Sequence, residues 1–298
     1  MFYYTLYNLR VISEFCLPGI QPVAVTDNYD VSVRNGFLTF PQKSKSLDSA
    51  FHYFRSDDDF FLLVKDVGIF KVDGGNKITV NPLTDDLSAV SLFLLGSCFG
   101  MLLLQREILC LHAGAVVDQS GQNSFLFLGP SGVGKSSLIT FFHRNGLKIL
   151  GDDVIPLQID DDKILATSSI SRVKLWENSV TRELIQDEKG IRIREDLDKY
   201  MYMLPAETHE NKYGVKTLFI LNWVANGDAP ITFRKLDGPL ACLYLRENIY
   251  RYEIMDQPKD FSLIFNLLSF IEKKVPVYLI EGSRNLNSLK RILDEIKH

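Results

Sequence analysis

The residues with the clearest chemical potential form a glycine-rich turn near the middle of the chain. This turn consists of Gly129, Pro130, Ser131, Gly132, Val133, Gly134, Lys135, Ser136 and Ser137. The spacing is that of a phosphate-binding loop, in which successive backbone N–H groups surround phosphate oxygens. In such a loop Lys135 contacts the β- and γ-phosphates, and the Ser136 hydroxyl binds Mg²⁺. The sequence therefore predicts a site for a nucleoside triphosphate.

A pair of adjacent carboxylates, Asp152 and Asp153, follows soon after this loop. Phosphoryl transfer depends mainly on positioning, charge neutralisation and an acceptor for the substrate's hydroxyl proton. Successive side chains along a strand point to opposite sides, so one carboxylate can face the metal and the other the substrate. We expect Asp152 to be the base and Asp153 to face the metal, although the reverse assignment stays open. An exposed acidic turn, as predicted for 160–162, is the alternative.

His112 lies one predicted strand before the loop, between the apolar residues 108–111 and 113–116. A histidine can act as a general acid or base near neutral pH. A histidine among apolar residues is, however, more often a core residue than a ligand. The residues alone therefore leave both interpretations of His112 open.

The elements around the loop must place these side chains together. The apolar run 124–128 predicts a strand, 135–145 has the apolar spacing of a helix that ends at Gly146, and 147–150 predicts the next strand. Together they predict a βαβ unit. Parallel strands joined by such a crossover have their carboxyl ends beside the loop, where Asp152 and Asp153 follow.

The remaining pattern predicts two domains, residues 1–83 and residues 84–298. The first domain is expected to be a mostly antiparallel sheet because short apolar or alternating runs follow one another between turn signals. These runs are 3–11, 31–33, 37–40, 51–54, 60–64, 68–72 and 77–80, with a hairpin turn at 73–76. In the second domain we expect strands at 108–117, 155–159, 163–167, 173–176, 215–223 and 277–280, and helices at 240–246, 260–272 and 288–297. The strands 155–159 and 163–167 flank the acidic turn 160–162 and are expected to form a hairpin.

The uncharged run from Leu87 to Leu104 is long enough to be considered as a membrane-spanning helix. It contains serines and two glycines, Gly96 and Gly100, and it follows the helix N-cap signal Thr84, Asp85, Asp86. We therefore expect a buried core helix, with the glycines serving close packing of this helix on a sheet, and no membrane partner. A membrane component is the alternative.

Composition favours a soluble globular protein. The chain has 298 residues, is 46% hydrophobic and carries a net charge of −4. It shows no basic stripe, so we expect no nucleic-acid partner. The four cysteines have no CxxC spacing, which argues against a zinc site or a disulfide framework, and they suit a reducing cytoplasm. The N-terminus lacks the pattern of a secretion signal, so a cytoplasmic location is expected.

Three ordered motifs resemble the HPr serine kinase family: 111–116 around His112, 127–138 across the loop, and 146–154 around the two aspartates. The chain is more closely similar to the HPr-kinase-related kinases found with peptide natural-product clusters, including lasso-peptide precursor kinases. Weaker similarity to that subgroup covers 4–10, 17–19, 174–176 and 199–200. The glycine-rich signature that accompanies phosphorylase activity in true HPr kinases is not recognisable after residue 200. The resemblance therefore does not extend to the reverse reaction or to HPr as substrate.

This resemblance implies an α/β (α+β) fold with the P-loop kinase core shared with phosphoenolpyruvate carboxykinase, preceded by the N-terminal β-rich domain. It implies ATP and Mg²⁺ as cofactors and transfer of the γ-phosphate to a serine-type hydroxyl of a peptide, protein or small metabolite. It places Lys135 on the phosphates, Ser136 on Mg²⁺, and the Asp152/Asp153 pair as base and metal partner in either order, and it brings His112 to the transferred phosphate. The alternative from another class is a nucleotide-sensing protein without an acceptor. The sequence leaves a homo-oligomer open.

Overall fold

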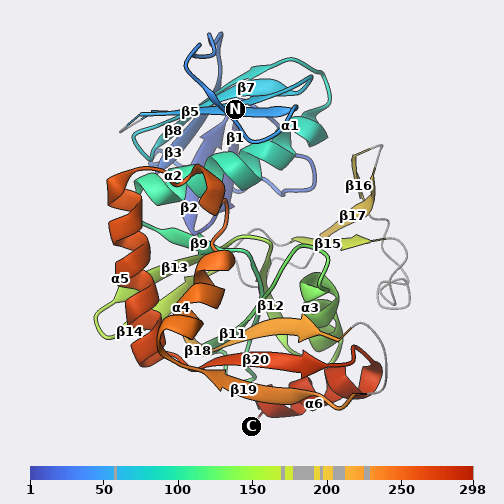
Figure 1. Ribbon diagram of the computed structural model, residues 1–298. Helices are drawn as coiled ribbons and strands as arrows, with labels where there is room; N and C mark the ends of the chain where they lie inside the picture. Colours follow the sequence, from blue (N-terminus) through green and yellow to red (C-terminus); the bar gives the residue numbers. More distant parts are fainter. Residues whose placement is uncertain are drawn as a thin grey trace.

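The computed structural model is a mixed α/β structure in which two large sheets lie above one another, with helices between and around them (Figure 1). It describes residues 1–56, 59–168, 172–176, 191–194, 197–203, 212–224 and 229–297. The N-terminus lies on the first sheet and the C-terminus beyond the second, at opposite ends of the molecule in this view.

The first sheet is mostly antiparallel, as the sequence predicts. Its eight strands have the order β1-β2-β3-β8-β7-β6-β5-β4, and only β3 pairs in parallel with both of its neighbours. The strands are β1 Phe2–Leu6, β2 Leu9–Ser13, β3 Val31–Asn35, β4 Lys45–Ser46, β5 Phe51–Arg55, β6 Asp59–Val64, β7 Gly68–Asp73 and β8 Lys77–Pro82. The predicted hairpin turn is confirmed: Gly74 and Gly75, with φ of 56° and 68°, join β7 to β8.

Two predictions for this sheet were wrong. The run 3–11 is not one strand but the hairpin β1–β2, because Tyr7 and Asn8 both adopt left-handed backbone with φ of 54° and 60°. Residues 37–40 form no strand, and Phe37 is 88% exposed. A strand needs a neighbouring strand for its backbone hydrogen bonds, and residues 37–40 have none. Their hydrophobicity alone therefore did not predict a strand correctly.

The long apolar segment is a buried helix, as expected. It consists of α1 Leu87–Phe93, a π-helical turn η1 Leu94–Cys98, and α2 Phe99–Gln105. Within the described residues it is the one helix long and apolar enough to cross a membrane, and 78% of its most apolar window is buried inside the protein. Asp86 caps it, because its side chain accepts hydrogen bonds from the backbone of Ser88 and Ala89.

The second sheet carries the glycine-rich loop that the sequence predicts to bind phosphate, between β11 and the helix that follows. Its main path is β12-β10-β11-β18-β14-β13-β9, with β20 also paired to β18 and β19 paired to β20. The strands are β9 Leu109–Leu111, β10 Ala113–Val117, β11 Asn123–Leu128, β12 Lys148–Asp152, β13 Ile155–Asp160, β14 Lys163–Thr167, β18 Lys212–Trp223, β19 Thr232–Leu236 and β20 Val277–Gly282. The predicted hairpin of 155–159 with 163–167 is confirmed as β13–β14.

The predicted βαβ unit needs a correction. Strands β11 and β12 flank the helix α3 Lys135–Arg144 and run in the same direction, but they are not neighbours. Strand β10 lies between them and is antiparallel to both. The carboxyl ends of β11 and β12 still reach the same edge, so the aspartates lie beside the loop although the direct parallel pairing does not exist.

Alternation along β11 divides the core into two faces. Phe125 and Phe127 join a cluster with residues of α3 and of α6 Leu286–Lys297. Leu126 and Leu128 face the opposite way and join the cluster formed with α4 Gly238–Glu247, α5 Pro258–Lys274 and the helix of 87–105. This second cluster continues into the first sheet, so one apolar core joins residues on both sides of the predicted boundary at 83.

A small third sheet lies to one side. It has the order β15-β17-β16, formed by β15 Arg172–Trp176, β16 Ile191–Arg194 and β17 Leu197–Met203. The sequence predicted β15 but not the other two. Helix α3 contacts β15, so this sheet borders the helix that follows the phosphate loop.

Candidate functional site

The turn between β11 and α3 has the backbone shape that a phosphate-binding loop requires. Gly129, Gly132 and Gly134 have φ of 144°, 85° and 102°, values that favour glycine. Gly134 is the residue before the first turn of α3, so the helix begins directly at the loop and presents its free N–H groups there. The predicted strand, loop and helix are therefore all present in that order.

Lys135 and Ser136 occupy the inner side of this turn. Lys135 is 5% exposed, and its Nζ donates to the carbonyl oxygens of Gly129 at 2.6 Å and Pro130 at 3.2 Å. Ser136 Oγ donates to Asp152 Oδ1 at 3.0 Å. Asp152 is 8% exposed, so this carboxylate is buried against the first turn of α3.

Asp153 faces a different environment from its neighbour. Its Oδ1 lies 3.1 Å from His112 Nδ1, and both side chains keep about a quarter of their surface exposed, at 22% and 27%. Its backbone has φ of 82°, a left-handed conformation unusual for a residue with a side chain. The two adjacent aspartates therefore point to different partners, as expected, but the cause is the left-handed turn at Asp153 after the end of β12 and not alternation along a strand, and it is Asp152 that adjoins Ser136.

His112 stands at a break in the sheet. The sequence predicts one strand over 108–117, whereas the structure has two, because β9 pairs with β13 while β10 pairs with β11 and β12. The backbone N–H of His112 leaves the sheet and donates to the carbonyl oxygen of Asn248 at 2.7 Å. This break turns the imidazole toward Asp153 instead of into the core.

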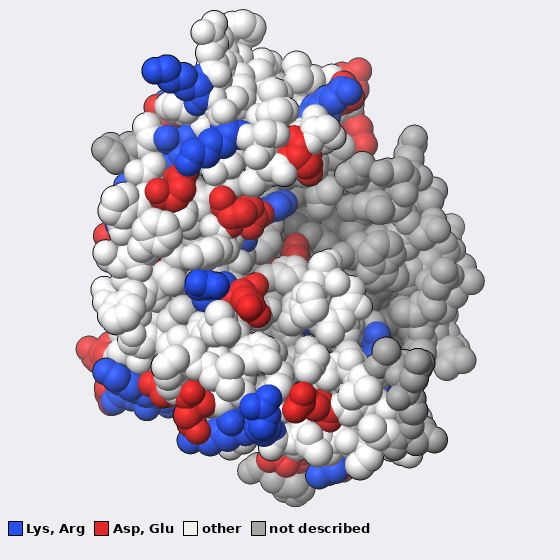
Figure 2. Space-filling view, viewed as in Figure 1, with Lys and Arg blue, Asp and Glu red and all other residues white. Residues whose placement is uncertain are grey.

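A cavity of about 500 Å³ opens beside this pair. Its walls come from the start of the loop, from the His112–Asp153 pair, from the chain after α4, and from the long apolar helix. The lining residues are Leu92, Phe93, Ser97, His112, Gly129, Pro130, Ser131, Asp153, Glu247, Asn248, Ile249, Tyr250, Arg251 and Glu253. Figure 2 shows the molecule hollowed between the two large sheets, with both acidic and basic side chains around the hollow.

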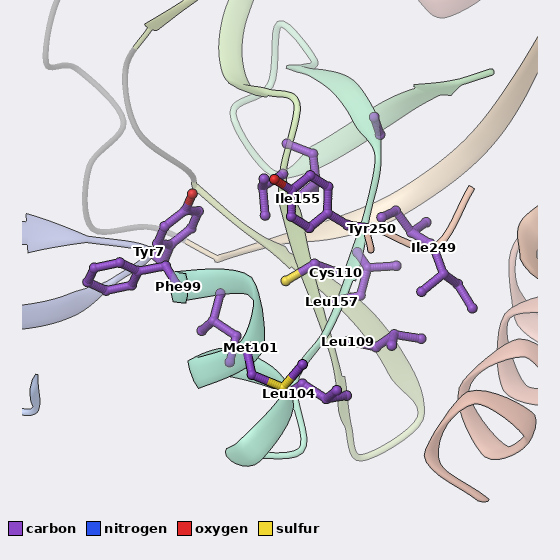
Figure 3. Packing of buried hydrophobic residues seen from close by; sticks show 14 of the residues in the cluster. Tyr7, Phe99, Met101, Leu104, Leu109, Cys110, Ile155, Leu157, Ile249 and Tyr250 are labelled. Carbon is purple, nitrogen blue, oxygen red and sulfur yellow. The ribbon is translucent and has the colours of Figure 1, made fainter. Parts of the chain in front are cut away.

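Tyr250 lines the cavity next to His112. Its ring stacks with the His112 ring at a centroid distance of 6.3 Å and an interplanar angle of 25°. The glycines of the apolar helix make room for it: a Cβ on Gly96 would lie 2.9 Å from Tyr250 Oη, and one on Gly100 would lie 3.1 Å from two ring carbons. Figure 3 shows Tyr250 near Ile155 and Cys110 in this core. The two glycines do allow close packing, as expected, but their partner is the Tyr250 side chain in the turn after α4 and not a strand of the sheet.

Asn248 is a residue that the sequence did not single out. It is 6% exposed, and its Oδ1 accepts a hydrogen bond of 2.7 Å from the backbone N–H of Gly129. Its backbone carbonyl holds His112, and its Nδ2 donates to Tyr244 at 2.8 Å. One buried amide thus ties the first residue of the loop to the strand break at His112, and no local pattern in the sequence signals a contact across 119 residues.

Arg284 and Trp223 complete the surroundings of the loop. A Cβ on Gly134 would lie 2.6 Å from Arg284 Cζ, so the guanidinium packs directly against the loop backbone. Burial of this guanidinium lowers the pKa of Arg284. Trp223 Nε1 donates to the Val133 carbonyl oxygen at 2.9 Å. Trp223 ends β18 and Arg284 follows β20, and these positions could have marked them because the two parallel strands end at the loop edge.

The donor set around Ser136 fits a magnesium ion. Mg²⁺ takes hard oxygen ligands and is bound by one or two carboxylates together with phosphate oxygens and water. The hydroxyl and carboxylate oxygens of Ser136 and Asp152, 3.0 Å apart, are such a set. The described residues contain no cluster of three or more His, Cys, Asp or Glu side chains that would hold a metal by protein ligands alone.

Comparisons with known proteins give a limited result. No protein-family model and no curated protein sequence matches the chain. Among solved structures, the chain is similar to the Hpr(Ser) kinase/phosphatase from Coxiella burnetii, with 13% identity, a TM-score of 0.35, and coverage of 62% of this chain and 86% of that one. An identity and a TM-score this low assign neither a family nor a function to this chain, so its function is inferred from the geometry of its site.

Proposed function

We propose that this protein is an ATP-dependent kinase that transfers the γ-phosphate to a serine-type hydroxyl of a peptide, protein or small metabolite. The observation that carries this proposal is the shared cavity. The first residues of the phosphate loop, Gly129 to Ser131, line the same space as His112 and Asp153. A triphosphate on the loop would therefore have its terminal group beside a carboxylate–imidazole pair.

In this proposal the loop holds the nucleotide. The backbone N–H groups of the loop and the start of α3 bind the phosphates, and the Lys135 ammonium exchanges its loop carbonyls for phosphate oxygens. Arg284, which packs on Gly134, adds a second positive charge at the loop. These groups neutralise negative charge on the phosphates and hold the terminal phosphorus in place, which is the main requirement of phosphoryl transfer.

The two aspartates have separate roles. Asp152 adjoins Ser136 and is proposed as the metal partner, while Asp153 lines the cavity and is proposed as the base. This reverses the assignment preferred from the sequence, because the Ser136 contact and the cavity separate the two carboxylates. When bound, Mg²⁺ would neutralise charge on the phosphate oxygens.

The transfer itself needs one proton acceptor. The substrate hydroxyl oxygen attacks the γ-phosphorus, the bond from that phosphorus to the bridging oxygen of ADP breaks, and the hydroxyl proton passes to the Asp153 carboxylate. His112 Nδ1, 3.1 Å from Asp153 Oδ1, orients this carboxylate toward the cavity. Tyr250 supports the imidazole from the other side by stacking.

Replacing Lys135 tests the proposal. We expect Lys135→Ala to lower phosphoryl transfer about 100-fold or more, because a preorganised charge at the developing phosphate charge is lost. The measurement is mass-spectrometric detection of phosphate on serine peptides and small hydroxy compounds incubated with ATP and Mg²⁺. Lys65→Ala, at an exposed turn of the first sheet, is the matched control and should retain activity.

Two results would contradict the kinase. Turnover in Lys135→Ala equal to that of the wild-type protein would show that the loop does not hold the reacting phosphate. ATP binding with no phosphorylated product from any acceptor would instead favour the nucleotide-sensing alternative.

A further inference from the structure

One wall of the cavity contains a cation that the proposed transfer does not use. Tyr250, Arg251 and Glu253 form this wall, opposite the start of the phosphate loop. Arg251 is the one lysine or arginine among the lining residues. It lies next in sequence to Tyr250, the residue that stacks on His112.

The conformation of Arg251 is specific and carries a cost. Its backbone has φ of 57°, in the left-handed region, which is unfavourable for a residue with a side chain. Its guanidinium carbon lies 5.7 Å from the Tyr250 ring centroid, and Nη1 donates to Glu253 Oε1 at 3.2 Å. Such strain persists where the surrounding structure imposes it, often at ligand sites.

The guanidinium also has an unused donor. Arg251 Nε is buried and has no hydrogen-bond partner among the described residues. Burial alone would lower the pKa of Arg251, but Tyr250 and Glu253 raise it, so the side chain stays positively charged. A buried donor of a charged group without a partner is costly, and a native structure that retains one requires an explanation such as a ligand.

The neighbouring charges indicate which ligand suits this cation. The Glu253 carboxylate accepts a hydrogen bond from Arg251 Nη1 at 3.2 Å, so this guanidinium already pairs with one carboxylate of the chain. Glu247 and Glu253 are exposed at the rim, where solvent screens them. They would oppose a doubly charged phosphate more strongly than a singly charged carboxylate, and arginine pairs well with carboxylates.

We propose, on the basis of the kinase function above, that the acceptor carries a carboxylate in addition to its hydroxyl, and that Arg251 binds this carboxylate. The Tyr250 ring centroid lies 6.3 Å from the His112 ring centroid and 5.7 Å from Arg251 Cζ, so one ring adjoins both residues. In this arrangement the acceptor's carboxylate lies at Arg251 and its reacting hydroxyl lies near His112 and Asp153. The two groups of the acceptor are therefore about the width of one aromatic ring apart. Arg251 is a specificity-determining residue in this arrangement and takes no part in the transfer.

Matched acceptors test this assignment. The probes are short serine peptides with Asp or Glu near the serine and their Asn or Gln counterparts, the same peptides with free or amidated C-termini, and small hydroxy acids with their amides. We expect the wild-type protein to phosphorylate the carboxylates about tenfold or more faster than the amides, since charged hydrogen bonds contribute about 1.5–3 kcal/mol. The favoured group of probes would show whether the carboxylate belongs to a side chain, a C-terminus or a free hydroxy acid.

Variants connect the preference to Arg251. In Arg251→Gln the ratio of acid to amide rates should fall to about one, with the loss falling on the acids, while Arg251→Lys should retain part of the preference. Arg246→Gln is the control, because this exposed arginine packs over Tyr252 and does not line the cavity. Thermal unfolding of each variant shows that it is folded.

The outcomes separate this inference from the kinase proposal. Equal transfer to acids and amides in the wild-type protein, or an acid preference that Arg251→Gln retains, would overturn the role of Arg251 and leave the kinase standing. Absence of transfer to every probe, with ATP bound, would overturn both.

Discussion

Adjacent aspartates in this protein have different surroundings because the chain turns sharply between them. Asp152 ends β12 and is held by Ser136, at the buried first turn of α3. Asp153 has left-handed backbone, and its N–H donates to the Ala113 carbonyl oxygen at 2.9 Å. The backbone thus directs one carboxylate to the loop and the other to His112, so identical side chains have different surroundings.

Magnesium dependence distinguishes the two residues. Asp152→Asn should raise the Mg²⁺ concentration for half-maximal transfer about tenfold or more, because the proposed carboxylate partner of the ion loses its charge. Asp153→Asn should lower kcat about 100-fold or more with little change in Mg²⁺ dependence, because an amide accepts no proton. Steady-state rates across a magnesium titration give both values. A shift of Mg²⁺ dependence in Asp153→Asn alone would restore the assignment preferred from the sequence.

At the scale of elements, the apolar helix of 87–105 supports the site although it contributes no reactive group. Its π-helical turn, Leu94–Cys98, contains Gly96, whose missing side chain admits the Tyr250 hydroxyl. The carbonyl oxygen of Leu95 in the same turn accepts a hydrogen bond of 2.6 Å from Tyr7 Oη in the first sheet. The turn therefore connects the N-terminal sheet to the residue that stacks on His112.

A methyl group on this turn should disturb the packing. We expect Gly96→Ala to reduce the free energy of unfolding by about 1–3 kcal/mol, because the added Cβ meets the end of a rigid side chain in a filled core. Denaturant unfolding measures this. Tyr250→Phe removes the oxygen concerned, so the double variant should be less destabilised than the sum of the two single variants. Additive effects would show that Gly96 and Tyr250 are not in contact.

The turn between β10 and β11 carries a titratable group. Burial alone would raise the pKa of Asp118, but hydrogen bonds from Ser120, Asn123 and Gln122 hold it below its ordinary value. The folded protein therefore binds this proton less readily than the unfolded chain. The stabilisation is fully present above the ordinary aspartate pKa, about 3.9, and is lost as pH falls through the lower folded value.

Comparison with Asp118→Asn tests this pH dependence. At neutral pH the variant should be less stable by about 1 kcal/mol, since hydrogen bonds to a charged acceptor are replaced by weaker ones. The difference should begin to shrink near pH 4, where the carboxyl of the unfolded chain takes up its proton, and should be lost as pH falls through the lower folded pKa. Urea unfolding at several pH values provides the curve. A difference that is constant from pH 7 to pH 3 would exclude a titrating Asp118.

At the scale of the whole molecule, a buried ion pair joins the first sheet to a helix that packs on the second. Arg55 of β5 pairs with Asp260 of α5, and their side chains are 3% and 2% exposed. The pair is doubly bonded, with Arg55 Nη2 donating to Asp260 Oδ1 at 2.7 Å. Asp260 Oδ2 also accepts from the backbone N–H of Gln257 at 3.0 Å, and Arg55 donates to the Ile254 carbonyl oxygen at 3.1 Å. Both charges are therefore satisfied inside the interface.

Removing one partner should be costly. We expect Arg55→Met to lower the free energy of unfolding by about 3–5 kcal/mol, because Asp260 is left as a buried charge without its cation. Replacing both, as Arg55→Met with Asp260→Leu, should recover most of the loss, since an apolar pair needs no compensating charge. Calorimetry also shows whether the protein unfolds in one transition. An Arg55→Met variant as stable as the wild-type protein would contradict the buried pair.

Local features of this protein were predictable from the sequence. Glycine spacing, the apolar periods of 135–145 and 260–272, and the turn signals at 73–76 and 160–162 depend on residues close together in the chain. Local backbone preferences and amphipathic periods are carried by neighbours, so they survive without knowledge of the fold. The loop, its flanking strand and helix, the two hairpins and the burial of the apolar helix were therefore all expected.

Only the tertiary structure decided how these parts meet. The insertion of β10 between β11 and β12, the hold of Asn248 on Gly129, and the place of Tyr250 and Arg251 in the cavity join segments far apart in sequence. Such contacts depend on which strands pair and which faces are buried, and no short pattern encodes either. The types of the candidate site residues can thus be read from the local sequence. The packing of distant segments decides which of them lie at the glycine-rich loop and which line the cavity.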